Sequence, residues 1–102
     1  VHAFNNYYNS WRYYGLGCSY KGQCFSENNV YEAASHENAI LYKVGVDAKN
    51  GNVRSEGDWL LNGAIAHENN RSSVFSPSYN YNAENAGNNL INKIEDRAGW
   101  EE

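Results

Sequence analysis

The sequence predicts an all-β chain of short parallel strands, wound into a solenoid and closed by a short C-terminal helix. Three observations favour this fold class. An Asn-Asn string occurs at 5–6 and again at 28–29, each string is flanked by short strand-like runs, and an apolar face of helical period lies near the C-terminus. A repeat with the spacing of these two Asn-Asn strings is typical of solenoid coils, which stack at the ordinary interstrand spacing of about 4.8 Å. Equivalent side chains of successive coils should therefore lie directly above one another.

The repeat places particular pairs of residues in register. The shift that superposes Asn6 on Asn29 also superposes Tyr8 on Tyr31. Asparagine tolerates the left-handed backbone of a tight bend, and its amide can bond to the asparagine of the next coil. We therefore expect Asn6 and Asn29 to form a structural ladder beside a stack of the two tyrosines. A degenerate third copy is expected at 59–65. The spacing alone also fits two unrelated hairpin turns of a sandwich.

Two cysteines, Cys18 and Cys24, stand six residues apart, with Gly22 between them to permit a tight return. In a secreted protein they would close a small loop by a disulfide, whereas in a cytosolic protein they would stay reduced. We expect the disulfide and an extracellular location. The triplet Asn70-Arg71-Ser72 fits the glycosylation sequon, which is compatible with secretion but does not establish it.

Residues 83–98 are expected to form the terminal helix. Leu90, Ile91, Ile94 and Ala98 recur at steps of three and four, which gives one apolar face. Asn80 or Asn82 could cap the start of this helix and Gly99 could end it; a frayed tail is the alternative.

The predicted organisation follows from these elements. Residues 1–82 form coils with an inserted loop around 34–57, which contains a turn signal at 47–52. Residues 83–102 form the helix and tail.

Composition excludes several functional classes. The chain has 102 residues, a net charge of −4 and 17 asparagines, so uncharged groups carry most of its polarity. Without a basic stripe we expect no nucleic-acid partner. No apolar run approaches the roughly 20 residues that span a bilayer, so we expect no membrane segment. The histidines His2, His36 and His67 lack metal-ligand spacing.

The string Val-His-Ala-Phe-Asn-Asn-Tyr-Tyr at 1–8, with the segments 14–17 and 26–33, resembles the pectate lyase family of polysaccharide lyases. The segments 53–55 and 60–64 resemble its later coils, and the tail helix resembles its C-terminal segment. The resemblance implies a right-handed parallel β-helix from a secreted enzyme. It also implies cleavage of polygalacturonate, the backbone of pectin, by β-elimination, in which calcium helps to acidify the proton that is removed.

The same resemblance indicates what this chain lacks. The family's Arg-x-Pro-x-x-Arg motif precedes the Val-His string, and its calcium-binding carboxylates lie further upstream. The arginines here are dispersed at positions 12, 54, 71 and 97. We therefore assign no catalytic residue and no metal ligand, and expect calcium in the parent enzyme but none bound by this chain. The chain then resembles the C-terminal portion of such an enzyme, inactive alone, with the missing N-terminal β-helix portion as its partner.

The resemblance also implies a cleft along one sheet, here the strand at 14–19 with the Cys18–Cys24 loop beside it. Trp11, Arg12 and Lys21 are the candidate substrate contacts, because tryptophan offers a flat face to a sugar and cations pair with uronate carboxylates. Trp11 could instead pack onto the fold with Arg12 solvated. The pair Tyr42-Lys43 is a second candidate. A non-catalytic pectin-binding module or a purely structural β-helix fragment remains the alternative function.

Overall fold

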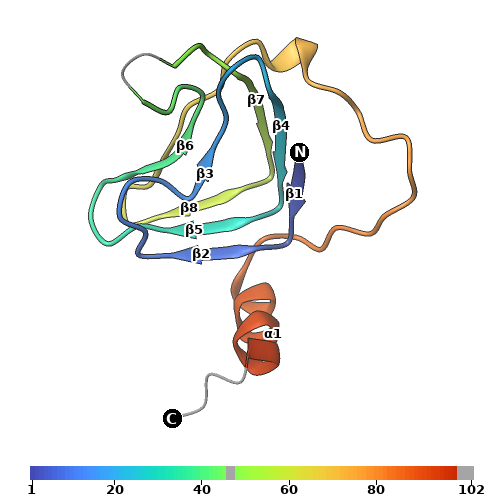
Figure 1. The fold of residues 1–102 in the computed structure, drawn as a ribbon. Coiled ribbons are helices and arrows are strands. Elements are labelled where there is room, and N and C mark those ends of the chain that lie inside the picture. Colours follow the sequence, from blue (N-terminus) through green and yellow to red (C-terminus); the bar gives the residue numbers. More distant parts are fainter. Residues whose placement is uncertain (46–47, 99–102) are drawn as a thin grey trace.

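The computed structural model describes residues 1–45 and 48–98, which form three parallel sheets and one α-helix. Each sheet takes one strand from each of three coils, so that the chain turns three times around a triangular section (Figure 1). The first sheet contains β1 (His2–Phe4), β4 (Gln23–Glu27) and β7 (Asn52–Glu56). The second contains β2 (Tyr7–Asn9), β5 (Val30–Glu32) and β8 (Trp59–Leu61), and the third contains β3 (Leu16–Gly17), β6 (Asn38–Leu41) and β9 (Ile65–Ala66).

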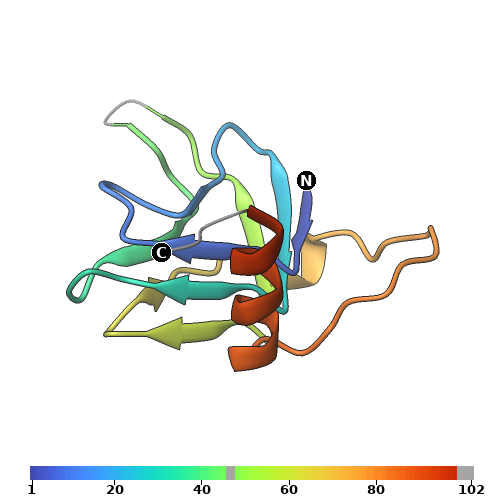
Figure 2. The same ribbon diagram turned by 90° about the horizontal axis from the view of Figure 1, so that it is seen from below.

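The register confirms the predicted parallel β-helix. His2 pairs with Phe25, and Tyr8 pairs with Tyr31, both at the shift that the repeat predicts. Tyr31 pairs in turn with Leu60 of the third coil, so the shift from the second coil to the third is larger than the shift from the first to the second. Figure 2 shows the coils stacked as successive layers.

The corner between the first two sheets repeats one backbone conformation. Asn5, Asn28 and Gly57 occupy it with positive φ angles of 54°, 51° and 65°. The following residue in each coil is Asn6, Asn29 or Asp58.

The expected third copy at 59–65 is therefore partly wrong. Trp59–Leu61 is the second strand of the third coil, but Asn62 lies at the next corner, where its carbonyl accepts a hydrogen bond from His36 N–H. Gly57 and Asp58 hold the positions of the Asn-Asn string. Glycine also permits the left-handed backbone and aspartate also accepts hydrogen bonds, so the third corner carries no Asn-Asn signal.

The ladder at this corner is built differently from a stack of paired amides. The Asn29 side-chain oxygen accepts from the backbone N–H of Asn6 at 2.7 Å, and Asp58 Oδ1 accepts from Asn29 N–H at 2.8 Å. Asn29 Nδ2 donates to Ala3 O and to Ser26 Oγ, both at 2.9 Å. Asn29 is fully buried, whereas Asn6 is exposed. The side chain of one coil thus satisfies the backbone of the preceding coil.

The core fills the interior of the triangle. Tyr31, Ile40 and Val53 are completely buried, and the Tyr8 ring stacks on Tyr31 with centroids 4.7 Å apart and planes 6° apart. The predicted tyrosine stack is therefore present. The two rings bury a large apolar area in the geometry that aromatic pairs favour.

The long loop expected around 34–57 contains two strands, β6 and β7. The connection between them is 42–51, of which Val46 and Asp47 lie outside the described residues. This connection joins the second coil to the third and accounts for the larger shift from Tyr31 to Leu60.

The segment that follows the last coil and leads to the C-terminal helix, which we call the strap, covers the outer face of the first sheet. After the short 3-10 helix η1 (Arg71–Ser73), Tyr79 and Tyr81 pack against His2, whose ring stacks on Phe25 at 4.9 Å. Arg54 lies 3.9 Å from the centroid of the Phe25 ring. The strap thereby buries a column of rings that would otherwise face solvent.

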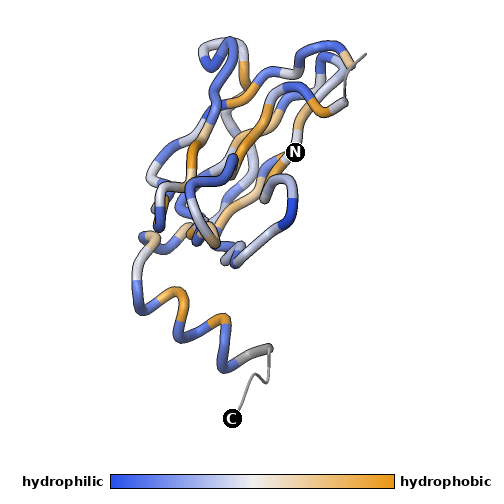
Figure 3. Tube along the Cα trace, turned by 90° about the vertical axis from the view of Figure 1, so that its left-hand side faces the viewer, coloured by the Kyte–Doolittle hydropathy of each residue, from blue (hydrophilic) through white to orange (hydrophobic). Residues whose placement is uncertain are grey.

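The helix α1 (Asn88–Ala98) begins five residues later than the expected position 83. Glu84 exchanges two backbone hydrogen bonds of 2.7 Å with the Asn5 side chain, which holds the preceding segment extended. Asn80 and Asn82 are therefore too far upstream to cap the helix, and Gly99 lies outside the described residues. Leu90 is buried, the helix lies beside β2, and its hydropathy alternates along the chain (Figure 3).

Candidate functional site

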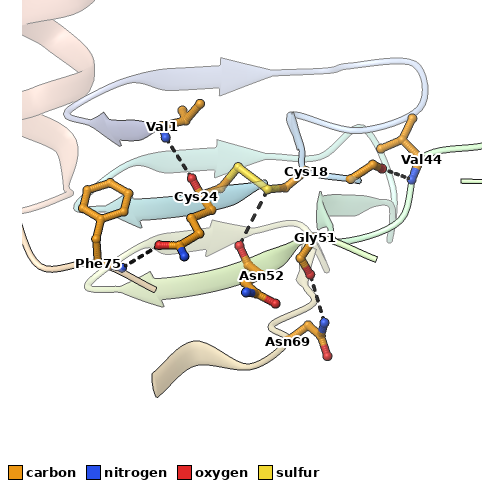
Figure 4. The surroundings of a disulfide bond; sticks show 10 residues. Val1, Cys18, Cys24, Val44, Gly51, Asn52, Asn69 and Phe75 are labelled. Carbon is orange, nitrogen blue, oxygen red and sulfur yellow. Dashed lines mark hydrogen bonds between the residues drawn. A yellow bond between two sulfur atoms is a disulfide. The ribbon is translucent and has the colours of Figure 1, made fainter. Parts of the chain in front are cut away.

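The corner between the third and first sheets carries the candidate site. Cys18 and Cys24 are joined by a disulfide there, as predicted, with their Cα atoms 6.3 Å apart. Both cysteines are buried, and Cys18 Sγ lies 3.6 Å from the carbonyl oxygen of Asn52 in the next coil (Figure 4). The disulfide closes the first turn of this corner.

The turns at this corner are stacked by hydrogen bonds. Tyr20 N–H donates to Lys49 O at 2.7 Å and Lys21 N–H donates to Asn50 O at 3.0 Å. A Cβ at Gly51 would lie 2.8 Å from the carbonyl carbon of Cys18, so only glycine fits this contact. Backbone N–H and C=O groups that would bond to water in an isolated loop here bond to the neighbouring coil. These hydrogen bonds fix the turns relative to one another.

The third turn joins the stack through amide side chains. Asn69 Nδ2 donates to Gly51 O at 2.9 Å (Figure 4). Asn70 Nδ2 donates to Asn52 Oδ1 at 3.2 Å. Val53 and Asn69 also form an antiparallel bridge. The three turns together make one continuous ledge along the solenoid.

The ledge is hollowed. We call this depression the corner hollow; it encloses about 660 Å³ and is lined by Lys21, Lys49, Asn50, Asn52, Asn69 and Asn70. Both lysines are exposed and form no ion pair with another described residue. None of the described residues that line the hollow carries a carboxylate. A positively charged, amide-rich surface is thus present on a chain with a net charge of −4.

A second depression of about 310 Å³ adjoins the corner hollow and shares Asn50 with it. Tyr42 and Lys43, the second candidate pair, line it together with Leu41 and His67. Three of the four lysines of the chain, Lys21, Lys43 and Lys49, therefore lie in the turns on this side of the third sheet. Sequence reasoning found Lys21 and Lys43 but missed Lys49 and the asparagines.

The structure separates the three predicted substrate contacts. Trp11 and Arg12 lie between β2 and β3, whereas Lys21 lies between β3 and β4. Trp11 packs edge-on against the buried Tyr31 with ring centroids 6.2 Å apart. Arg12 is exposed, and its guanidinium carbon lies 5.3 Å from the Tyr13 ring centroid. Trp11 thus belongs to the packing around the core, and only Lys21 lines the corner hollow.

The groups whose pKa values are clearly perturbed lie elsewhere in the fold. Burial, together with a 2.6 Å hydrogen bond to the Glu32 carboxylate, raises the pKa of Tyr7 to about 12. Burial also raises the pKa of the Asp58 carboxyl, while hydrogen bonds from Ser55 and Asn29 oppose the rise. These shifts arise in the β-helix framework, and we assign none of these groups a chemical step.

The described residues do not provide a ligand set for the calcium that the resemblance implies. Across residues 1–45 and 48–98, no three His, Cys, Asp or Glu side chains gather closely enough to hold a metal ion. His2 bonds to Tyr79 Oη at 2.6 Å and to Glu27 Oε1 at 3.0 Å, and His67 bonds to Asn38 Oδ1 at 2.9 Å. We therefore route no step through calcium bound to these residues. None of the described helices is long and apolar enough to cross a membrane.

Comparison with known proteins identifies relatives along the whole chain. The sequence model of a family described as pectate lyase matches residues 1–102. A protein of Arabidopsis thaliana named "Probable pectate lyase 13" is 31% identical over 107 residues, which cover 97% of this chain and 21% of that protein. A protein of Zinnia elegans named "Pectate lyase" is 37% identical over 76 residues, which cover 66% of this chain and 18% of that protein. The chain thus spans about a fifth of the length of these curated relatives. No solved structure matches it.

Proposed function

Because the chain belongs to the pectate lyase family, we propose that it is the C-terminal part of a secreted enzyme that cleaves polygalacturonate by calcium-assisted β-elimination. The family match along residues 1–102 carries this proposal. Since the chain spans about a fifth of the relatives, the activity, substrate, calcium and secretion are proposed for the whole protein. The disulfide between Cys18 and Cys24 supports secretion, because disulfides persist in oxidising compartments.

The proposed role of this chain is to provide scaffold and a distal wall for the substrate. The third sheet is bordered by two sets of turns, one carrying Trp11 and Arg12 and the other carrying Lys21. Arg12 and Lys21 are exposed cations that can pair with uronate carboxylates. Trp11 holds its turn on the core through Tyr31.

The proposal places the base and the calcium ligands in a preceding part of the β-helix. The hydrogen-bonded ladders of the three sheets end at β1, β2 and β3. Each of these strands leaves one edge for a further parallel strand, which is how one coil of a solenoid continues into the next. In this proposal the chain contributes to substrate binding but contributes no catalytic group.

The test uses the complete gene product with polygalacturonate and calcium, and follows the ultraviolet absorbance of the unsaturated uronate product. We expect product with calcium and none after chelation. Residues 1–102 alone should form none. Absence of product from the complete protein at every calcium concentration would overturn the proposal. Binding of oligogalacturonate without product would favour the non-catalytic pectin-binding alternative.

Variants separate the substrate wall from the scaffold. Arg12→Gln should raise KM two- to fivefold, since one solvent-exposed charge pair contributes about 0.5–1 kcal/mol. Lys93→Gln removes one positive charge on α1, where Lys93 pairs with Glu84 at 2.7 Å; it is the charge control and should leave KM unchanged. Equal effects of the two variants would remove Arg12 from the proposed wall.

A further inference from the structure

We propose that the corner hollow binds an acidic saccharide, with Lys21 and Lys49 pairing with uronate carboxylates and the surrounding asparagines bonding to hydroxyls. This inference rests on the proposed function for the identity of the saccharide. It reassigns Lys21 from a set with Trp11 and Arg12 to a set with Lys49. The other members of that set are the four asparagines of the stacked turns.

The charge of the hollow selects an anionic ligand. Lys21 and Lys49 are both exposed and have no acidic partner among the described residues, and the six lining residues are all lysine or asparagine. Although the chain carries a net charge of −4, an approaching polyanion is attracted to this positively charged surface. Because the lysines are solvated, each lysine–carboxylate pair should contribute only a small binding free energy, and salt should weaken it.

The amides of the hollow suit a hydroxylated ligand. Asn69 and Asn70 each use Nδ2 to join the neighbouring turn, so each leaves its Oδ1 as an acceptor. Asn52 accepts with Oδ1 and leaves its Nδ2 as a donor, and Asn50 is exposed. Sugar hydroxyls both donate and accept, and this mixed set of amide atoms matches them better than it matches an apolar ligand.

The hollow is also held in place before a ligand arrives. The disulfide closes the first turn, and three backbone hydrogen bonds join it to the second: from Tyr20 to Lys49, from Lys21 to Asn50 and from Asn52 to Gly22. Binding therefore orders little backbone, which lowers its entropic cost.

The turns recur once per coil along the solenoid. Lys21 belongs to the first turn, Lys49 and Asn50 to the second, and Asn69 and Asn70 to the third. A ligand that repeats along its own length can therefore meet a new turn with each repeat. A chain of uronate residues has this property, with one carboxylate and several hydroxyls in each residue.

The experiment locates the contact directly. Oligogalacturonate carboxylates are activated with a carbodiimide and mixed with the complete gene product in the presence of a chelator, which suppresses the calcium-assisted cleavage. An activated carboxylate that rests against a lysine amine forms an amide bond and releases the activating group. The protein is made in bacteria, so that no eukaryotic glycan occupies Asn70, the sequon residue that lines the hollow. Peptide mapping then identifies the coupled lysines.

We expect coupling at Lys21 and Lys49 in clear excess over Lys93, and suppression of that coupling by excess unactivated oligogalacturonate. Fully methyl-esterified oligogalacturonate, which lacks the charge, should not compete. If sulfate or acetate competes as well as the oligosaccharide at equal charge, the hollow binds small anions only and the saccharide assignment falls. Coupling at Lys93 equal to that at Lys21 and Lys49 would overturn the proposal.

Calorimetric titration of oligogalacturonate against the complete gene product measures the contribution of each lysine to Kd. Lys21→Gln and Lys49→Gln should each raise Kd two- to fivefold, and the double variant about four- to twenty-five-fold, with Lys93→Gln unchanged. Unchanged affinity in the double variant, with product still formed by the calcium-supplemented protein, would overturn the corner site but leave the proposed function standing. Absence of both product and binding would overturn both.

Discussion

Replacing Asp58 with asparagine should stabilise the protein, because Asp58 holds the corner position that Asn29 holds one coil earlier. Asp58 Oδ1 accepts from Asn29 N–H at 2.8 Å and Oδ2 accepts from Ser55 Oγ at 2.5 Å. In the preceding coil, Asn29 Nδ2 donates both to Ser26 Oγ and to Ala3 O. Ser26 and Ser55 are paired in register, as Ala3 and Ser26 are.

The magnitude follows from this correspondence. An asparagine at position 58 keeps the bond from Asn29, reverses the bond with Ser55, and adds a donor toward the carbonyl of Ser26. One additional buried hydrogen bond contributes about 0.5–1.5 kcal/mol. The substitution also removes a carboxylate whose pKa burial raises, so the charged form no longer has to be desolvated. We expect Asp58→Asn to raise the free energy of unfolding by about 1 kcal/mol near neutral pH.

The pH dependence gives this prediction a signature. Because the folded pKa of Asp58 lies above its ordinary value of 3.8, the folded state binds a proton more tightly than the unfolded state. The wild-type protein therefore loses stability as pH rises from below 3.8 through the raised pKa. The asparagine variant lacks this loss, so its advantage should grow across that range and then level off.

Denaturant unfolding of the complete gene product at several pH values measures both quantities. Asp58→Ala is the control. It removes the acceptor of Asn29 N–H and should lower stability by about 1–3 kcal/mol. An asparagine variant less stable than wild type at neutral pH, or an advantage that shrinks as pH rises, would refute the reasoning.

Three further predictions concern the framework. Asn29→Ala should lower the free energy of unfolding by about 3 kcal/mol, since it removes the three side-chain hydrogen bonds with Asn6, Ala3 and Ser26. Denaturant unfolding measures this, and a loss below about 1 kcal/mol would contradict the ladder. Reducing the Cys18–Cys24 disulfide should lower the free energy of unfolding by about 2 kcal/mol, as expected for so small a loop; an unchanged melting temperature in the double serine variant would argue against it. Residues 1–102 alone should fold poorly or self-associate through the strand edges of β1, β2 and β3. A monomer with a sharp melt, in sedimentation and calorimetry, would be the opposite result.

Much of the fold could be predicted because its first two coils repeat. Asn6 over Asn29 and Tyr8 over Tyr31 follow from one constant shift along the chain, and the disulfide follows from the close spacing of its cysteines around Gly22. In these places, neighbours in space stand at a constant distance along the chain.

The third coil could not be aligned in the same way. The longer connection that leads into the third coil changes the shift between paired residues, so that Tyr31 pairs with Leu60. Gly57 and Asp58 also replace the Asn-Asn string at this corner while making equivalent contacts. The helix start was misplaced for a similar reason. The Asn5 side chain holds the backbone of Glu84 from far along the chain, and no local pattern at 83–87 reveals this contact.

The sequence by itself determined the class of fold, the corner amides and the family resemblance, because each depends on residues close together or at one constant spacing. Only the tertiary structure decided that Lys21 lies with Lys49 and Asn69 rather than with Trp11 and Arg12. Turns of unequal length bring those residues together across three coils. Their proximity therefore depends on hydrogen bonds between coils and not on separation along the chain.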